Sequence, residues 1–519
     1  MNKQPTNLTS PEIRKHNGIE TLFVNNEPFI ILGGEIHNSS ASNLQFMEDN
    51  VWPNLEDLHM NTVLVPIYWE QIEKVEGVFD YTVLDGIIQQ ARKYQKRLVL
   101  LWFGLWKNSE SMYVPGWIKK DSDTYFRAKK ISGELLNTIS PLSQAAVQKD
   151  ATALAHILGH IREVDQIENT VIAIQVENEI GLLGTDRDYS DVAEKEFAQN
   201  VPAEIEKAFS VQGAWRDCFG YEAGEYFMAF HFAKAVEAIT QAAQKEYALP
   251  CYANAWLKQY PWFSGSYPSG GPVASMHTIW KLMAPSLFCL APDIYVPYVP
   301  QVMAEYHQDG NPLFIPEVRK DAVTASYALY AFGAHNAIGY SPFALEELSM
   351  DPKDIQKPPM EVMIALNIDP TAFDIEGSKE CLSSVYSLME NIKPMYFKYR
   401  NTSQLKCYLK QTETDFGAVL NFEKYDFQIA YAPKQPCKPL AAGMVYEVGE
   451  NSFFIMGMMS TINVLPKPGE NKKVSILTLE DGDFVDGEWK AGRQLNGDER
   501  MSLQMNDRLC CYFLELYKY

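Results

Sequence analysis

Eight short apolar runs separated by helical patterns are the feature that most limits the fold of this chain. In each run the apolar residues are nearly continuous rather than alternating, which is typical of strands buried on both faces. Such strands form parallel sheets covered by helices, because a crossover must return the chain to the start of each new strand. The predicted strands are 28–35, 61–70, 97–104, 170–179, 250–257, 292–297, 312–318 and 336–343.

Helical patterns precede the second, third, fourth and fifth of these strands, at 51–60, 81–95, 143–164 and 225–247. Eight strands alternating with helices predict an α/β fold of the (β/α)8 TIM barrel type. The connections on either side of the fourth strand are long and carry many aromatic and charged residues. We expect these insertions to build a substrate cleft over the barrel mouth.

The pattern changes near residue 400. The segment 383–400 predicts a last helix, and only short strand-like runs separated by turn residues follow it. We therefore predict a barrel catalytic domain over 1–398 and a C-terminal antiparallel, sandwich-like all-β domain over 399–519. That second domain could bind sugar, cover a barrel edge or mediate assembly. Its predicted strands lie in 405–411, 416–423, 427–434, 443–449, 451–458, 473–492 and 508–519.

Composition excludes several classes of partner. The net charge of −21 repels phosphate backbones and anionic lipids, so neither nucleic acid nor a membrane is expected to bind. The sequence contains no apolar run of about 18 residues, so no transmembrane helix is predicted. The polar N-terminal stretch 1–18 lacks the apolar core of a secretory signal. The eight cysteines form no C-x-x-C pair, as expected of reduced thiols in a cytoplasmic protein. A homo-oligomer is compatible with the sequence.

No metal or cofactor motif is present. His156 and His160 are spaced as in a zincin helix, but the residue after the first histidine is Ile157, where that motif needs glutamate. Neither a G-x-G-x-x-G pattern nor a P-loop occurs. We therefore expect no cofactor and no metal.

Chemistry in a (β/α)8 barrel sits at the carboxyl ends of the strands. Glu179 ends the fourth predicted strand and Glu317 the seventh, so their side chains could converge across the mouth. Paired carboxyls among aromatic residues are the equipment of glycoside hydrolysis. One protonates the leaving oxygen, and the other attacks the anomeric carbon or activates water.

Several motifs resemble glycoside hydrolase family 35, the β-galactosidases, which lies within the clan of retaining (β/α)8-barrel glycosidases. The subgroup resembled is bacterial and has a compact β domain after the barrel. The resemblance covers about residues 15–395. Its motifs are GGEIHNSSASN (33–43), MNTVLVPIYWEQIEKVEGVFDY (60–81), LWFGLWKN (101–108), YVPGWIK (113–119), QVENEIG (175–181), YPSGGP (267–272), APDIYVPY (291–298) and IPEVRKD (315–321).

The resemblance implies a retaining exo-β-galactosidase that acts on a β-galactoside oligosaccharide or glycoside. Glu179 would be the acid/base, Glu317 the nucleophile, and Asn178 the partner of the sugar 2-hydroxyl. Glu177 is interpreted as a supporting neighbour. Tyr295 or Tyr298 would hydrogen-bond Glu317. The other predicted substrate contacts are Glu35, Asn38, Tyr68, Trp106, Asn108, Asn254 and Trp256.

Asn38 marks a departure, since most members of the family have a tyrosine there. Another β-linked sugar, such as glucose, fucose or arabinose, therefore stays open as the substrate. The classes that compete with this prediction are a non-catalytic carbohydrate-binding barrel and a metal-dependent barrel hydrolase. A retaining mechanism further predicts a raised pKa for Glu179, a low pKa for Glu317, and carboxyls about 5–5.5 Å apart.

Overall fold

The computed structural model describes residues 9–308, 310–501 and 503–519. Within those residues, eight parallel strands close into a barrel in chain order, which confirms the predicted fold class. Residues 1–8 of the stretch used to exclude a secretory signal lie outside the described residues. The barrel strands are β4 (Ile31–Glu35), β5 (Thr62–Tyr68), β6 (Arg97–Lys107), β9 (Val171–Asn178), β10 (Cys251–Trp256), β11 (Leu287–Ile294), β12 (Phe314–Val318) and β13 (Gly339–Pro342).

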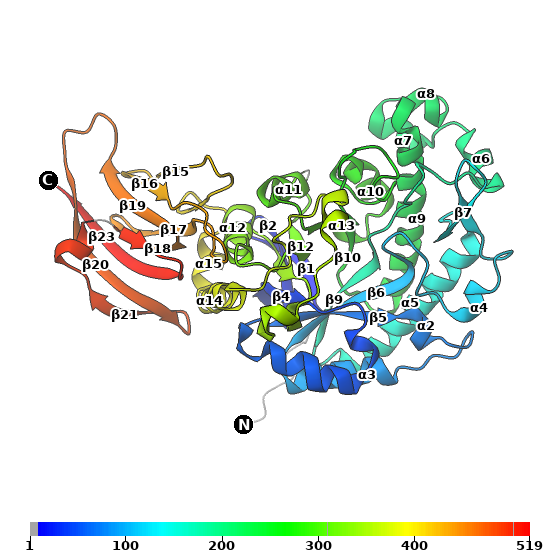
Figure 1. Cartoon of the computed structure of the whole chain (residues 1–519), viewed down its shortest axis with the longest axis horizontal. Coiled ribbons are helices and arrows are strands. Elements are labelled where there is room, and N and C mark those ends of the chain that lie inside the picture. Colours follow the sequence, from blue (N-terminus) through cyan, green and yellow to red (C-terminus); the bar gives the residue numbers. More distant parts are fainter. Residues whose placement is uncertain (1–8, 309, 502) are drawn as a thin grey trace.

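Helices cover the outside of the barrel (Figure 1). They bury their apolar faces on strands that are themselves almost wholly buried, as the continuous apolar runs predict. The outer helices are α3 (Thr82–Lys93), α5 (Gln144–Asp165), α9 (Ala223–Glu246), α10 (His277–Met283), α11 (Val299–Tyr306) and α12 (Thr324–His335). The short helix α13 (Met360–Ala365) lies in the connection after β13, and Met363 is its buried residue.

Two predicted elements differ in detail. The segment 51–60 is a 3-10 helix, η3 (Trp52–Leu58), with Pro53 in its first turn, rather than an α-helix. It follows η1 (Ser40–Ser42), α1 (Leu44–Phe46) and the π-turn η2 (Met47–Val51), and α2 (Trp69–Ile72) caps β5. β11 begins five residues before the predicted strand, since Pro292 lies inside the strand and does not start it.

The long insertions on either side of β9 gather over one side of the barrel, at the right of Figure 1. The inserted elements are α4 (Gly116–Lys119), β7 (Arg127–Lys129), β8 (Leu135–Ile139), α6 (Asp191–Phe197), α7 (Ala203–Phe209), α8 (Trp215–Phe219) and η4 (Gly220–Glu222).

A separate three-stranded antiparallel sheet of β1 (Glu12–His16), β2 (Ile19–Val24) and β3 (Glu27–Phe29) leads into β4.

The last predicted helix is two helices, α14 (Ser378–Asn391) and α15 (Lys393–Tyr399), with Pro394 in the first turn of the second. In the described residues beyond them lie a six-stranded and a four-stranded antiparallel sheet, with an apolar core that includes Phe427, Phe453 and Leu514. Their strands are β14 (Leu405–Leu409), β15 (Gly417–Asn421), β16 (Tyr425–Tyr431), β17 (Ala442–Gly449), β18 (Ser452–Met458), β19 (Ser460–Pro466), β20 (Val474–Val485), β21 (Glu488–Gln494), β22 (Leu503–Met505) and β23 (Cys510–Lys518).

This β region packs on α12, the helix that follows β12. The Ser326 hydroxyl donates to the carbonyl of Leu440 at 3.0 Å and accepts from its N–H at 2.9 Å. A Cβ at Gly333 would lie 3.1 Å from atoms of Cys407 and Met444, so the two parts are in close contact. The β region thus covers one flank of the barrel (Figure 1). The domain boundary at 398/399 stays a prediction. Among the described helices, none is both long and apolar enough to span a bilayer.

Candidate active site

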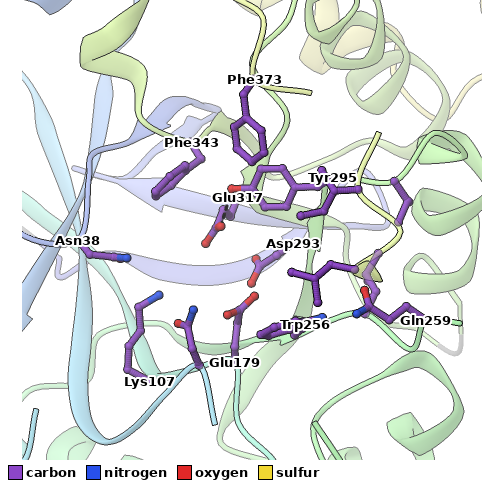
Figure 2. Close-up of a pocket in the computed structure, with 15 residues that line it drawn as sticks. Asn38, Lys107, Glu179, Trp256, Gln259, Asp293, Tyr295, Glu317, Phe343 and Phe373 are labelled. Atoms are coloured by element: carbon purple, nitrogen blue, oxygen red, sulfur yellow. Dashed lines mark hydrogen bonds between the residues drawn. The ribbon is translucent and has the colours of Figure 1, made fainter. Parts of the chain in front are cut away.

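A cavity of about 260 Å³ opens at the carboxyl ends of the barrel strands (Figure 2). It brings together the two carboxyls that the sequence singles out, Glu179 after β9 and Glu317 in β12. Aromatic side chains form part of its wall, as a sugar site requires. The lining residues are Asn38, Lys107, Asn108, Glu179, Trp256, Leu257, Gln259, Asp293, Tyr295, Val296, Glu317, Phe343, Leu366, Ile368 and Phe373.

The backbone at the end of β9 departs from regular strand geometry. Glu177 and Glu179 both have left-handed φ values, +64° and +46°. Such values are uncommon for residues other than glycine and often mark functional sites. The distortion lets the two side chains occupy different surroundings: Glu179 lines the cavity, whereas the Glu177 carboxylate accepts the N–H of Trp106 at 2.6 Å behind the wall.

Glu177 lies beside another buried carboxyl, Asp150 of α5. Asp150 accepts from the Trp102 indole at 2.7 Å and from the Leu105 N–H at 2.8 Å. Burial raises the pKa of both carboxyls, and their mutual contact raises that of Glu177 further. A Cβ at Gly104 would meet both groups at under 3 Å, so only glycine fits between them. This acid pair holds the end of β6 against β9 and so supports the wall of the site.

A network of amides fixes Glu179. Asn254 accepts the backbone N–H of Glu179 at 3.0 Å, and its side-chain amide donates to Asn178 at 3.2 Å and to Asp293 at 2.6 Å. Asn178 in turn donates to Asn108 at 3.3 Å. Asn178 and Asn254 are almost wholly buried and do not line the cavity, so in this structure they position the acid.

Tyr295, rather than Tyr298, contacts Glu317. Its hydroxyl donates to the Glu317 carboxylate at 2.5 Å. The cations that follow Glu317 in the chain have other partners, because Arg319 binds Asp321 at 2.7 Å and Lys320 binds Glu347. Glu317 therefore faces the cavity instead of serving as the partner of a neighbouring cation.

The two carboxyls have distinct electrostatic surroundings. Burial and the charge of Glu317 raise the pKa of Glu179 to about 8. Burial also raises the pKa of Glu317, although Lys107 and the Tyr295 hydroxyl act in the opposite direction. The expectation that Glu317 keeps a low pKa is therefore wrong, because desolvation outweighs both stabilising partners. The negative charge of Glu317 is thus one of the causes that keep the proton on Glu179.

Lys107 and Asp293 are site residues that sequence reasoning did not select. Lys107 is the cation among the described lining residues, and its charge lowers the pKa of Glu35, Glu179, Asp293 and Glu317. Asp293 and Glu35 are themselves buried, which raises the pKa of each well above its usual range. The position of Lys107 and Asp293 at the ends of β6 and β11 was the sequence signal that could have selected them. Gln259, Phe343 and Phe373 also line the cavity unpredicted and lie on loops, beyond the reach of strand-end reasoning.

Unpartnered polar atoms surround the cavity. Asn38 Oδ1 and Gln259 Nε2, which belong to lining residues, are buried and have no hydrogen-bond partner among the described residues, and the same holds for Glu35 Oε1. Leaving such atoms unpaired is costly, so each one calls for a ligand or solvent partner. Acceptors and a donor arranged around a small cavity suit a ligand that carries several hydroxyl groups.

Three predicted substrate contacts lie elsewhere. The indole of Trp106 is fully buried, donates to the carbonyl of Ile139 at 2.9 Å and packs on Phe232. The hydroxyl of Tyr68 donates at 2.6 Å to the carbonyl of Asn38 and so supports that residue from behind. Tyr298 lines a neighbouring hollow. The interpretation as sugar contacts is corrected for Trp106 and Tyr68, whose polar groups bind backbone carbonyls of the protein, and Tyr298 does not line the catalytic cavity. Asn38, Asn108, Trp256 and Tyr295 do line the cavity.

The described residues contain no group of three or more His, Cys, Asp or Glu side chains that could hold a metal ion. On α5, His160 pairs with Asp85 at 2.7 Å and stacks on Tyr81, while His156 stacks on Phe79. The histidine pair is thus engaged in packing on the outside of the barrel.

Three solved structures are similar to this chain. The catalytic domain of β-amylase from Paenibacillus polymyxa is 11% identical, and the match covers 61% of this chain and 92% of that one with a TM-score of 0.47. β-Galactosidase from the psychrophilic Marinomonas ef1 is 11% identical, with 70% of this chain and 60% of that one covered and a TM-score of 0.45. An exo-β-1,4-mannosidase from Opitutaceae bacterium strain TAV5 is 12% identical, with 70% and 60% covered in the same order and a TM-score of 0.40. The chain thus spans 60% of the length of the latter two. No curated protein matches it.

Family models assign both parts of the chain. The model for a domain of unknown function, DUF5597, matches residues 382–505, which contain most of the β region. The model described as glycosyl hydrolases family 35 matches residues 21–260, from the N-terminal sheet to the loop after β10. That match includes Glu179 and ends before Glu317, whose placement in the site rests on the geometry above. Residues 21–260, which contain the first five strands of the barrel, therefore match glycosyl hydrolases family 35, and the chain is a glycoside hydrolase.

Proposed function

We propose that this chain is a retaining exo-β-galactosidase that releases terminal, non-reducing β-D-galactosyl units. The observation that carries the proposal is the pair Glu179 and Glu317 in one cavity, with the pKa of Glu179 raised to about 8 by burial and by the charge of Glu317. The choice of galactose follows the resemblance to the family 35 β-galactosidases. The cavity of about 260 Å³ lies below the range of about 300–1,000 Å³ usual for drug-sized ligands, which favours a single sugar unit.

In this mechanism the Glu317 carboxylate attacks the anomeric carbon and forms an ester bond to it. The bond from that carbon to the leaving oxygen breaks, and the Glu179 proton passes to that oxygen. Glu179, now a carboxylate, then takes a proton from water. The water oxygen attacks the anomeric carbon, the ester bond to Glu317 breaks, and galactose leaves with its original anomeric configuration. The Tyr295 hydroxyl holds Glu317 in place through both steps.

The first test is a set of initial rates on nitrophenyl glycosides that differ only in the sugar: β-galactoside, β-glucoside, β-fucoside, α-arabinoside and α-galactoside. We expect the highest kcat/KM on the β-galactoside and no turnover of the α-galactoside. NMR of the first sugar product should show the β-anomer before mutarotation. Preference for another β-sugar would overturn the substrate but keep the mechanism, and an α-anomer as first product would overturn retention.

Lys107 should set the acidic side of the pH profile. Replacing it with methionine in Lys107→Met removes the positive charge that lowers the pKa of Glu317. Glu317 must be ionised to attack, so its protonated fraction at a given acidic pH rises in the variant. The acidic limb of kcat/KM should move to higher pH, and the rate on that side should fall about tenfold or more.

The matched control is Lys107→Arg, which keeps the charge and should keep the position of the acidic limb. Log kcat/KM against pH for the two variants and the wild type checks this. Equal acidic limbs in Lys107→Met and Lys107→Arg would show that the charge does not act on the nucleophile.

A further inference from the structure

A second hollow of about 300 Å³ lies next to the catalytic cavity, between the loop after β10 and helix α11. Leu257 lines both, so the two spaces meet at this side chain. The remaining lining residues of the hollow are Lys258, Trp262, Ala274, Ser275, Tyr298, Gln301, Val302, Glu305 and Tyr306.

The loop between the two spaces carries an unusual group of exposed aromatic side chains. Tyr260, Trp262 and Phe263 are 66%, 51% and 48% exposed, directly after Gln259, whose buried Nε2 faces the catalytic cavity unpartnered. Exposed apolar residues gathered beside a cleft are a common mark of a binding surface. The backbone of Trp262 has a left-handed φ of +69°, which is rare for so bulky a residue and recurs where proteins clamp ligands.

We propose that this hollow binds the leaving-group part of the substrate, a neutral oligosaccharide attached to the terminal galactosyl unit. The inference rests on the proposed function, since it extends the substrate of the same site. A chain that leaves the catalytic cavity over Leu257 enters the hollow beside Trp262 and Tyr298. Their rings offer flat apolar faces for the C–H faces of a pyranose.

The polar groups of the hollow suit a neutral ligand with hydroxyl groups. Lys258 pairs with Glu222 at 3.7 Å and with Glu225 at 4.0 Å, and Gln301 donates to Glu305 at 2.9 Å. Both charged side chains of the hollow thus have partners within the protein, so neither needs a charged ligand. The arrangement also accounts for Tyr298, a predicted substrate contact that does not line the catalytic cavity.

The test compares two substrates with the same galactosyl unit. One is methyl β-D-galactoside, whose leaving group is too small to reach Trp262, and the other is a linear tetrasaccharide that ends in a β-galactosyl unit. Released galactose is measured for the wild type, Trp262→Ala, Trp262→Phe and Phe416→Ala. Phe416 serves as the matched control, because it is an exposed aromatic residue, 80% accessible, on the C-terminal β region.

Trp262→Ala should lower kcat/KM about tenfold on the tetrasaccharide, mostly through KM, and leave the rate on methyl galactoside within about twofold. Trp262→Phe should recover part of the loss, and Phe416→Ala should match the wild type. An equal loss on both substrates, or no loss on the tetrasaccharide, would overturn this inference alone. A folded wild type that cleaves neither substrate would overturn the proposed function, and the inference that rests on it.

Discussion

Glu317→Gln is expected to abolish hydrolysis, with kcat lower by about 10⁴-fold or more. The amide keeps the shape of the side chain and can still contact the Tyr295 hydroxyl that lies 2.5 Å from the carboxylate in the wild type. It cannot form the ester bond to the anomeric carbon, so the first chemical step has no nucleophile. Initial rates on nitrophenyl β-galactoside and the thermal midpoint of unfolding would be measured together.

The matched control is Glu225→Gln. Glu225 is also a buried carboxyl with a pKa raised by burial, but it binds Tyr267 at 2.8 Å and does not line the cavity. It should retain most of the activity. A Glu317→Gln protein that is folded and keeps more than about a hundredth of the wild-type rate would rule out Glu317 as nucleophile.

Azide gives an independent readout of the same role. In Glu317→Gly, azide can occupy the space of the missing carboxylate and attack the anomeric carbon from that face. The product should be the α-galactosyl azide, because one displacement inverts the configuration. A β-galactosyl azide from this variant would place the nucleophile elsewhere.

The barrel was predictable because its signal is repeated along the chain. Eight apolar runs buried on both faces leave few alternatives to a parallel sheet, and the order of strands in a closed barrel follows the chain. The positions of Glu179 and Glu317 follow from this, since strand ends meet at one mouth. The ends of the elements were less predictable. Pro53 lies in the first turn of η3, whereas Pro292 lies inside β11, and the sequence does not tell which of these places a proline takes.

Strand position did not predict which side chains at the strand ends face the cavity and which are buried behind its wall. The left-handed backbone at Glu177 and Glu179 breaks the strand alternation, so counting residues does not tell which side each faces. Trp106 was assigned to the sugar by its place after a strand, yet it is fully buried. Two strands of the C-terminal region were missed: β19, which pairs with β16 and β22, and β22, a three-residue strand at the edge of its sheet that is too short to carry a pattern.

The raised pKa of Glu317 has a related cause. The sequence predicted a tyrosine hydrogen bond to Glu317, which lowers its pKa, but it did not show how many buried carboxyls lie around the single ammonium group of Lys107. In the structure Glu35, Glu179, Asp293 and Glu317 all interact with Lys107. A site with more acids than bases keeps protons, and this surplus is what allows one carboxyl to act as an acid near neutral pH.

Replacing the acid should separate the two chemical steps. Glu179→Ala removes the proton donor, so the first step should slow by about 10²–10⁴-fold for substrates whose leaving oxygen needs protonation. With 2,4-dinitrophenyl β-galactoside, whose leaving group departs as a stable anion, the first step should remain fast. The second step also lacks its base, so the galactosyl-enzyme should accumulate after a burst of one dinitrophenolate per enzyme.

The burst, the mass of the covalent intermediate and its rescue by azide would be measured on the same protein. Azide needs no base, so it should speed turnover and give β-galactosyl azide, the product of two displacements. The fall in rate above about pH 8, where the wild type loses the Glu179 proton, should be absent from the variant. An alkaline limb that persists in Glu179→Ala would show that another group supplies the proton, and Asp293, which is buried and lines the same cavity, would be the next to replace.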